Sequence, residues 1–111
     1  MTTTFDVLAE PTRRRILDLL LQEPRSVGEL VEQLGLTQPG TSKHLRVLRE
    51  AGLVQVRKDA QRRWYELRTE PLVEVDEWLA PYRRRWAGTL DALERHLDTM
   101  PDDPAAERPV P

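Results

Sequence analysis

Residues 26–52 read SVGELVEQLGLTQPGTSKHLRVLREAG, and this stretch decides the fold. Ser26 and Glu29 have the spacing of a capping box, in which the serine hydroxyl accepts from the glutamate backbone N–H while the carboxylate reaches back. Gly35 supplies the left-handed residue with which many helices end. We therefore expect a short helix between Ser26 and Gly35, with an apolar inner face made by Val27, Leu30, Val31 and Leu34.

A second helix follows after a tight turn. Thr37 suits its N-cap, Pro39 its first turn and Gly52 its end. Leu45 and Leu48 fall on one side of this helix, which predicts that this side packs inward. Two short helices that meet across a glycine-containing turn form the helix-turn-helix pattern, whose second helix enters the major groove of DNA.

The other side of the second helix carries polar side chains. At about 100° per residue, four polar residues fall within about 140° of Gln38 and form one polar face with it: Ser42, Lys43, Arg46 and Arg49. Side chains near the start of such a helix meet base edges, whereas later ones more often meet phosphates. We expect Gln38, Thr41 and Ser42 to read bases, Lys43 to meet a guanine or a phosphate, Arg46 and Arg49 to meet phosphates, and His44 to donate to a phosphate or a backbone carbonyl.

Further elements flank the helix pair. Pro11 suits the first turn of a helix over about 11–23. Beyond the second helix the apolar period changes from 3.6 to 2, which predicts strands at 53–56 and 64–67 joined by a polar turn over 57–63. The chain is therefore expected to be mainly α with a small antiparallel β-hairpin.

The last predicted helix begins at Pro71 and has a long apolar stripe. Its spacing of three and four residues is close to that of a coiled-coil seam. Pro81 removes one backbone hydrogen bond, so we expect a kink or a break near Ala80. The stripe consists of Leu72, Val75, Leu79, Tyr82, Trp86, Leu90, Leu93, Leu97 and Met100.

Length and composition set the general class of the protein. A chain of 111 residues corresponds to one domain, here expected over 1–100, and the proline-rich residues 101–111 are expected to be a disordered tail. The longest apolar run is much shorter than the roughly 20 residues of a membrane span. The N-terminal sequence lacks the features of a secretory signal, so a cytoplasmic protein is expected. Without cysteine, disulfides and thiolate metal sites are excluded.

Charge is distributed unevenly along the chain. Residues 38–68 contain eight basic and three acidic residues, a net charge of +5, whereas the whole chain carries −2 and the remainder therefore −7. A basic segment in an acidic protein indicates a polyanionic partner for that segment. We expect the hairpin to contact the phosphates beside a minor groove through Arg57, Lys58, Arg62 and Arg63.

An ordered set of motifs resembles the ArsR/SmtB family of winged helix-turn-helix regulators. The motifs are LAEPTR at 8–13, SKHLRVL at 42–48, AGLV at 51–54 and RWYEL at 63–67. The resemblance covers about residues 5–100. It implies about five helices with a two-stranded wing, and a homodimer that represses transcription by binding a partly palindromic operator in double-stranded DNA. The helix at 38–51 would then lie in the major groove.

Dimerisation is also indicated by the apolar stripe, which is more than one helix of a small monomer can hide. The aromatic-rich last helix resembles a branch of the family that does not sense metals. Trp78, Tyr82 and Trp86 offer an alternative interpretation, a small-molecule pocket at the dimer interface for an unknown inducer. The interface residues expected from the stripe are Leu79, Tyr82, Trp86, Leu90, Leu93 and Leu97, and the resemblance to the family implies that Phe5 and Leu8 lie near them.

Other functions were weighed against the same residues. The family's thiolate site is absent because residues 28–34 contain no cysteine, and no cofactor or metal is expected. A zinc-responsive repressor remains an alternative, because the last helix offers Asp91, Glu94, His96 and Asp98, although a single histidine specifies zinc poorly. A module that binds RNA or protein is a second alternative. No nucleophile and base pair or catalytic carboxylate pair is visible, which argues against an enzyme.

Overall fold

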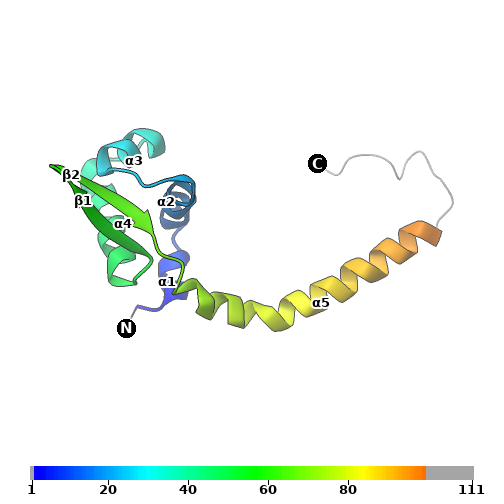
Figure 1. Cartoon of the computed structure of the whole chain (residues 1–111). Coiled ribbons are helices and arrows are strands. Elements are labelled where there is room, and N and C mark those ends of the chain that lie inside the picture. The colour runs from blue at the N-terminus through cyan, green and yellow to red at the C-terminus, as the bar shows by residue number, and fades with distance from the viewer. Residues whose placement is uncertain (1, 100–111) are drawn as a thin grey trace. The chain divides into compact units, whose positions relative to one another are not determined.

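The computed structural model describes residues 2–99. In chain order the elements are α1 (Thr4–Leu8), α2 (Pro11–Gln22), α3 (Val27–Leu34), α4 (Gln38–Glu50), β1 (Val54–Asp59), β2 (Arg62–Leu67) and α5 (Leu72–Thr99) (Figure 1). This set, five helices and one antiparallel hairpin within the described residues, confirms the predicted fold class. The chain divides into a first unit that ends at Glu77 and a second unit that starts at Trp78. The expected disordered tail lies outside the described residues.

The helix pair α3–α4 forms where the sequence predicted it, although only the serine half of the predicted Ser26–Glu29 capping box is present. The Ser26 hydroxyl accepts from the Glu29 backbone N–H at 3.2 Å, and Gly35 ends α3 with a φ of +66°. The Thr37 hydroxyl then accepts from the Gly40 backbone N–H at 3.1 Å and caps α4. Because each cap satisfies a backbone group that the helix leaves unpaired, these residues fix where α4 begins.

A single apolar core holds the first unit together. The inner faces of α2, α3 and α4 meet there, and the hairpin covers one side of it through its own apolar face. Ile16, Leu30 and Leu48 are fully buried. The remaining core residues are Val7, Leu17, Leu20, Leu34, Leu45, Leu53, Val54 and Tyr65.

A short first helix, α1, was not predicted from the sequence. Its capping box joins the Thr3 hydroxyl to the Asp6 backbone N–H at 3.1 Å and the Asp6 carboxylate to the Thr3 backbone N–H at 3.0 Å. These bonds, the backbone N–H of Thr3 first, hold the pKa of Asp6 below its ordinary value. The guanidinium of Arg14 donates to the Leu8 carbonyl at 2.6 Å and thereby satisfies a backbone group at the end of α1.

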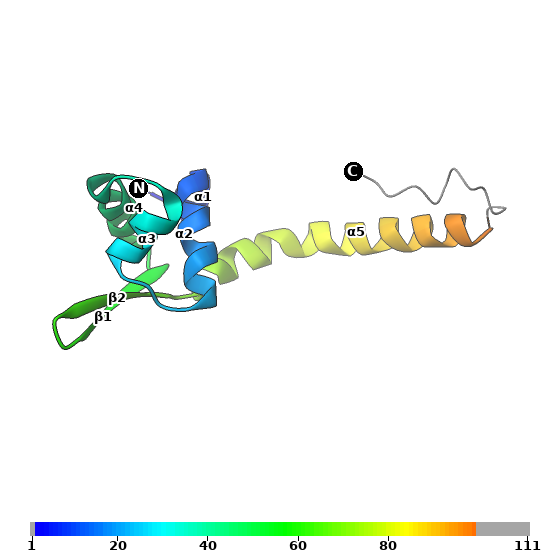
Figure 2. The ribbon, with the colours of Figure 1, turned by 90° about the horizontal axis from the view of Figure 1, so that it is seen from above.

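The hairpin is longer than predicted. The ladder pairs Val54 with Leu67 at its base and Asp59 with Arg62 at its tip, leaving a two-residue turn in which Ala60 has a φ of +58°. All four basic residues that the sequence placed in a turn over 57–63 are therefore strand residues, because the strands continue to pair beyond their apolar part. Figure 2 shows the hairpin extending past the helices of this unit.

Arg25 joins the edge of the hairpin through an isolated antiparallel bridge to Tyr65 on β2. Its backbone exchanges two hydrogen bonds with Tyr65, at 3.1 and 2.8 Å. Its side chain is buried and donates to the Leu19 carbonyl and to the side chain of Gln22. Arg25 thereby joins the loop after α2 to β2, because a buried guanidinium is stable only where its donors are bonded.

Helix α5 runs without interruption through Pro81, so the alternative of a break near Ala80 is wrong. In the second unit no described residue is buried, and the helix presents a row of exposed large apolar side chains. None of the described helices is long and apolar enough to span a membrane. The exposed apolar residues of this unit are Trp78, Tyr82, Trp86, Leu90, Leu93 and Leu97, and the rings of Trp78 and Tyr82 lie 5.1 Å apart.

Candidate nucleic-acid interface

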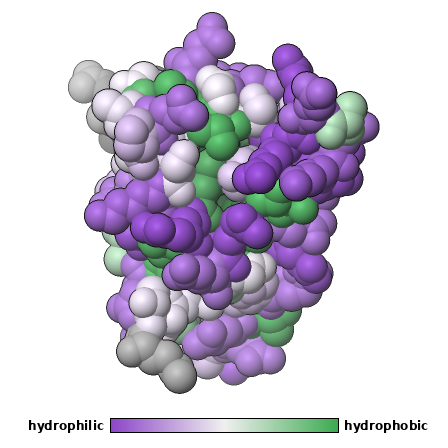
Figure 3. Space-filling view, turned by 90° about the vertical axis from the view of Figure 1, so that its left-hand side faces the viewer, coloured by the Kyte–Doolittle hydropathy of each residue, from purple (hydrophilic) through white to green (hydrophobic). Residues whose placement is uncertain are grey.

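The outer face of α4 is a polar, basic surface on a rigid support. The inner face of the same helix is held in the core by Leu45 and Leu48, which are 1% and 0% exposed. Figure 3 views the molecule from the side of the hairpin tip, where hydrophilic residues cover most of the surface. Side chains on such a helix are positioned well enough to recognise a ligand by geometry. The exposed residues predicted to meet DNA are Gln38, Ser42, Lys43, Arg46 and Arg49.

Thr41 does not belong to this surface, contrary to the prediction that it reads a base. Its side chain is 0% exposed, and its hydroxyl donates to the Thr37 carbonyl at 2.9 Å. On the helical wheel Thr41 lies about 300° from Gln38, between the two core leucines Leu45 and Leu48. It packs against the core and binds its own helix instead.

His44 links three helices rather than pointing freely outward. Its Nδ1 accepts from the Arg13 Nε at 3.4 Å, and the same guanidinium donates to the Val7 carbonyl at 3.3 Å. The half-buried imidazole thus fixes α4 against α2, and through Arg13 against α1. Because Nδ1 accepts this bond, Nε2 is the ring nitrogen that can donate to a phosphate, and that contact stays a prediction.

Glu10 marks the start of α2 beside this link. It accepts from the Thr12 backbone N–H at 3.1 Å. That bond is the main cause of a lowered pKa for the Glu10 carboxyl, with smaller contributions from the charges of His44 and Arg13. The carboxylate therefore caps α2 and keeps a negative charge close to the base of α4.

The hairpin carries basic residues on both faces. Lys58 and Arg63 are exposed and directly opposite each other in the ladder. Like charges at opposite positions destabilise a strand pair, and a bound anion would offset that repulsion. Arg62 lies at the tip with its guanidinium 5.6 Å from the ring centre of Trp64, which orients it by a cation–π contact.

Arg57, in contrast, is engaged by carboxylates of the hairpin itself. Its Nε lies 2.5 Å from Glu66 Oε1, and its Nη1 lies 3.7 Å from Asp59 Oδ2. The hydrogen bond to Glu66 raises the pKa of Arg57 and lowers the pKa of Glu66. The predicted phosphate contact of Arg57 would therefore have to displace Glu66 and Asp59 from its guanidinium.

The residues predicted for a dimer interface and for a zinc site lie outside the outer face of α4 and the hairpin. Phe5 is partly exposed and Leu8 packs on the core, whereas Leu79 is half-buried within the second unit. Over residues 2–99, no three histidine or acidic side chains gather closely enough to hold a metal ion within one chain. A zinc site shared by two chains would need a partner's residues.

Comparisons with known proteins agree with this geometry. The family model described as "Bacterial regulatory protein, arsR family" matches residues 10–56. The transcriptional repressor SdpR of Bacillus subtilis is 32% identical, over 71% of this chain and 88% of its own length. The transcriptional regulator Rv2034 of Mycobacterium tuberculosis is 35% identical, over 89% and 90% respectively.

Solved structures show the same architecture. An ArsR-like transcriptional regulator from Rhodococcus sp. RHA1 superposes with a TM-score of 0.63 at 26% sequence identity, covering 86% of this chain and 91% of that protein. These relatives are named as regulators and repressors of transcription, which are not enzymes. The chain therefore belongs to the ArsR family of DNA-binding transcriptional regulators, with a winged helix-turn-helix fold in which α3 and α4 are the helix pair and β1–β2 is the wing.

Proposed function

We propose that the chain is a homodimeric repressor that binds a partly palindromic operator in double-stranded DNA. One observation carries the DNA-binding part of this proposal. The outer face of α4 is exposed, hydrogen-bonding and cationic, while its inner face is fixed in the core by Leu45 and Leu48. This is the arrangement of a recognition helix in a major groove.

The two ends of α4 have different tasks in this proposal. Gln38 and Ser42, in the first turns, read base edges, and Lys43 binds a guanine edge or a phosphate. Arg46 and Arg49, farther along, neutralise phosphates and fix the register of the helix on the duplex. Thr37 and Gly40 support the first pair, because the Thr37 cap fixes where the helix begins.

The wing contacts phosphates beside the adjacent minor groove through Lys58, Arg62 and Arg63. Lys58 and Arg63 are both positive and lie opposite each other in the ladder, which supports this assignment, because a phosphate between them relieves their repulsion. Minor-groove base edges are nearly degenerate, so the wing adds affinity rather than sequence information.

Dimerisation rests on the exposed apolar row of α5. Six large apolar side chains between Trp78 and Leu97 are about half exposed or more, and a row of exposed apolar side chains is typical of an interaction site. A second copy of the chain is the occupant proposed, with Phe5 and Leu8 joining the interface. A two-fold dimer presents two α4 helices to one duplex, which is why a palindromic operator follows.

Repression is proposed because the relative SdpR is named as a transcriptional repressor. A bound dimer prevents transcription when its operator overlaps a promoter. Because the partner proposed is double-stranded DNA, we place the protein in the cytoplasm.

A binding titration with paired variants tests this division of labour. Gln38→Ala should weaken binding by about 1 to 3 kcal/mol, mainly on duplexes that keep the base pair it reads. Arg46→Ala should weaken binding to specific and random duplexes alike, and reduce the slope of log K against log salt by about 0.9. Arg95→Ala, which removes an exposed arginine from α5, is the matched control for the loss of charge.

Fluorescence anisotropy between 50 and 300 mM salt measures both quantities. If Gln38→Ala and Arg46→Ala weaken specific and random duplexes equally, α4 does not divide its work between bases and phosphates. Binding of RNA or protein with no dependence on duplex DNA would replace the proposed function altogether.

A further inference from the structure

We propose that Arg68 is a positioning residue that couples the wing to the first turn of α5. This inference rests on the proposed role of the wing in DNA binding. Arg68 lies directly after β2. It is the one basic residue of the segment 38–68 that was not predicted to contact DNA. Its contacts, rather than its charge, indicate what it does.

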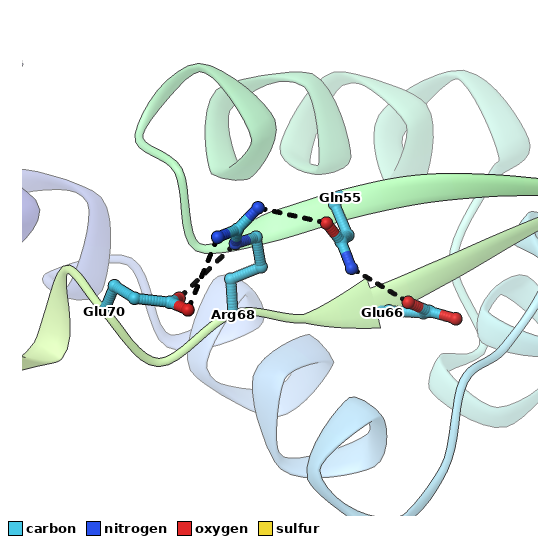
Figure 4. Close-up of polar contacts among 4 residues, drawn as sticks. All are labelled: Gln55, Glu66, Arg68 and Glu70. Carbon is cyan, nitrogen blue, oxygen red and sulfur yellow. Dashed lines mark hydrogen bonds and ion pairs between the residues drawn. The ribbon is translucent and has the colours of Figure 1, made fainter.

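Three parts of the first unit meet at Arg68. Its backbone N–H donates to the Leu53 carbonyl at 2.8 Å, which joins it to the residue between α4 and β1. Its Nη1 donates to Gln55 Oε1 at 3.1 Å on β1. Its Nε and Nη2 each lie 3.4 Å from the two oxygens of Glu70, just before α5 (Figure 4). One guanidinium thereby holds the wing and the start of α5 together.

The contacts of Arg68 continue along one face of the wing. Gln55 donates to Glu66 Oε2 at 3.0 Å, and Glu66 binds Arg57. Arg57 in turn lies near Asp59 at the tip. Alternating charges therefore run from the tip of the hairpin to Glu70 through Asp59, Arg57, Glu66, Gln55 and Arg68. We call these six residues the wing network.

The wing network lies on the face of the hairpin opposite to Lys58 and Arg63, because neighbouring strand residues point to opposite faces. Its two arginines are engaged by its three acids, so the cations left to meet phosphates are Lys58 and Arg63 on the opposite face and Arg62 at the tip. The wing network is thus suited to set the direction of the wing, while the opposite face and the tip bind phosphates.

The pKa values of the carboxylates are consistent with these contacts. The Glu66 pKa is lowered, first by its bond to Arg57 and then by Gln55. The Glu70 pKa is lowered by its own backbone N–H and then by Arg68. Both groups therefore remain ionised at neutral pH, where the wing network is complete.

Glu70→Gln is the decisive variant because charge and positioning predict opposite results. Removing an acidic charge near a DNA-binding surface should strengthen binding if only net charge matters. If Arg68 positions the wing, the same change weakens binding, because one anchor of the guanidinium loses its charge. Glu74→Gln, an exposed acid in the first turn of α5, is the matched control, and it should leave binding unchanged or slightly stronger.

Arg68 itself is replaced in two ways in the full-length chain. Arg68→Ala and Arg68→Lys should weaken duplex binding by a similar factor of about two to five, the size expected for exposed ion pairs, because lysine keeps the charge but loses the fork. A direct phosphate contact would instead be largely retained by lysine.

Amide hydrogen exchange of the free chain provides a readout that does not depend on DNA. Both Arg68 variants and Glu70→Gln should speed exchange in β1–β2 and at the Leu72 and Val73 amides, which donate to Thr69 and Glu70. Exchange equal to wild type in these segments overturns the proposal, as does tighter DNA binding by Glu70→Gln. If the wild-type chain binds no duplex, the proposed function fails, while the exchange result still decides whether Arg68 couples the wing to α5.

Discussion

The two units of this chain use apolar residues at the same helical spacing with opposite results. In α2, α3 and α4 the apolar faces meet and form a core in which Leu30 and Leu48 are fully buried. In α5 from Trp78 on, an equally regular stripe stays exposed, with Leu90 63% accessible. The spacing predicts a helix and its apolar face in both units. It does not state which surface covers that face, and in the second unit we assign that role to another copy of the chain.

The largest expected effect separates the two units by stability. Leu48→Ala should lower the free energy of unfolding by about 2 to 5 kcal/mol, because it removes buried methyl groups and leaves a cavity. Leu93→Ala should change it by less than about 0.5 kcal/mol in dilute, monomeric protein, where its side chain already contacts water. Urea unfolding at low protein concentration measures both. A comparable loss for the two variants would show that the stripe is covered by its own chain.

The next effect concerns assembly. The wild-type chain should sediment at about twice its 12.9 kDa mass at micromolar concentration, and Leu90→Arg should halve that mass by placing a charge in the stripe. Gly88→Arg is the matched control. Gly88 lies about 160° from the centre of the stripe, and no atom lies within 4 Å of an added Cβ there. A dimer retained by Leu90→Arg, or lost in Gly88→Arg, would contradict the assignment of this face.

A smaller effect distinguishes engaged from available cations in the first unit. Arg63→Ala should reduce the slope of log K against log salt by about 0.9, as expected for one lost phosphate contact. Arg57→Ala should reduce it by clearly less, because Glu66 and Asp59 already neutralise that guanidinium. Salt titrations with one duplex compare the two variants directly. Equal slopes would mean that Arg57 exchanges its carboxylates for phosphates.

The smallest effect is a pH dependence of the hairpin. In the folded chain the pKa of Glu66 is lowered from its ordinary value of 4.5. Glu66 therefore makes its full contribution to the free energy of unfolding at pH values above its pKa in the unfolded chain. That contribution is lost as the pH falls through its pKa in the folded chain. Glu66→Gln should lack this component and depend less on pH below about 4.5. Thermal unfolding between pH 7 and pH 3 measures the difference. Parallel curves for the two proteins would remove Glu66 from the acid sensitivity.

Local signals in the sequence predicted much of the first unit. The caps at Ser26, Thr37 and Gly35 and the change of period at the hairpin lie within a few residues of what they specify. The short helix α1 also had such a signal in the sequence, the capping-box spacing of Thr3 and Asp6. The buried position of Thr41 could similarly be found from its place between Leu45 and Leu48 on the helical wheel.

Other features depend on tertiary contacts that no local pattern encodes. The burial of Arg25 requires the Leu19 carbonyl and the side chain of Gln22 to meet its guanidinium. The engagement of Arg57 requires strand pairing that places Glu66 across from Gln55. Helix α5 tolerates Pro81 because the carbonyl that loses its partner lies on an exposed helix, where water can satisfy it.

Selection of bound duplexes from a random pool by the purified full-length chain tests the central claim most directly. Two α4 helices related by a two-fold axis should enrich an inverted repeat whose half-sites are about 10 base pairs, one helical turn, apart. Enrichment of a single unrepeated half-site, or of no sequence at all, would contradict the account of a dimer that reads DNA through α4.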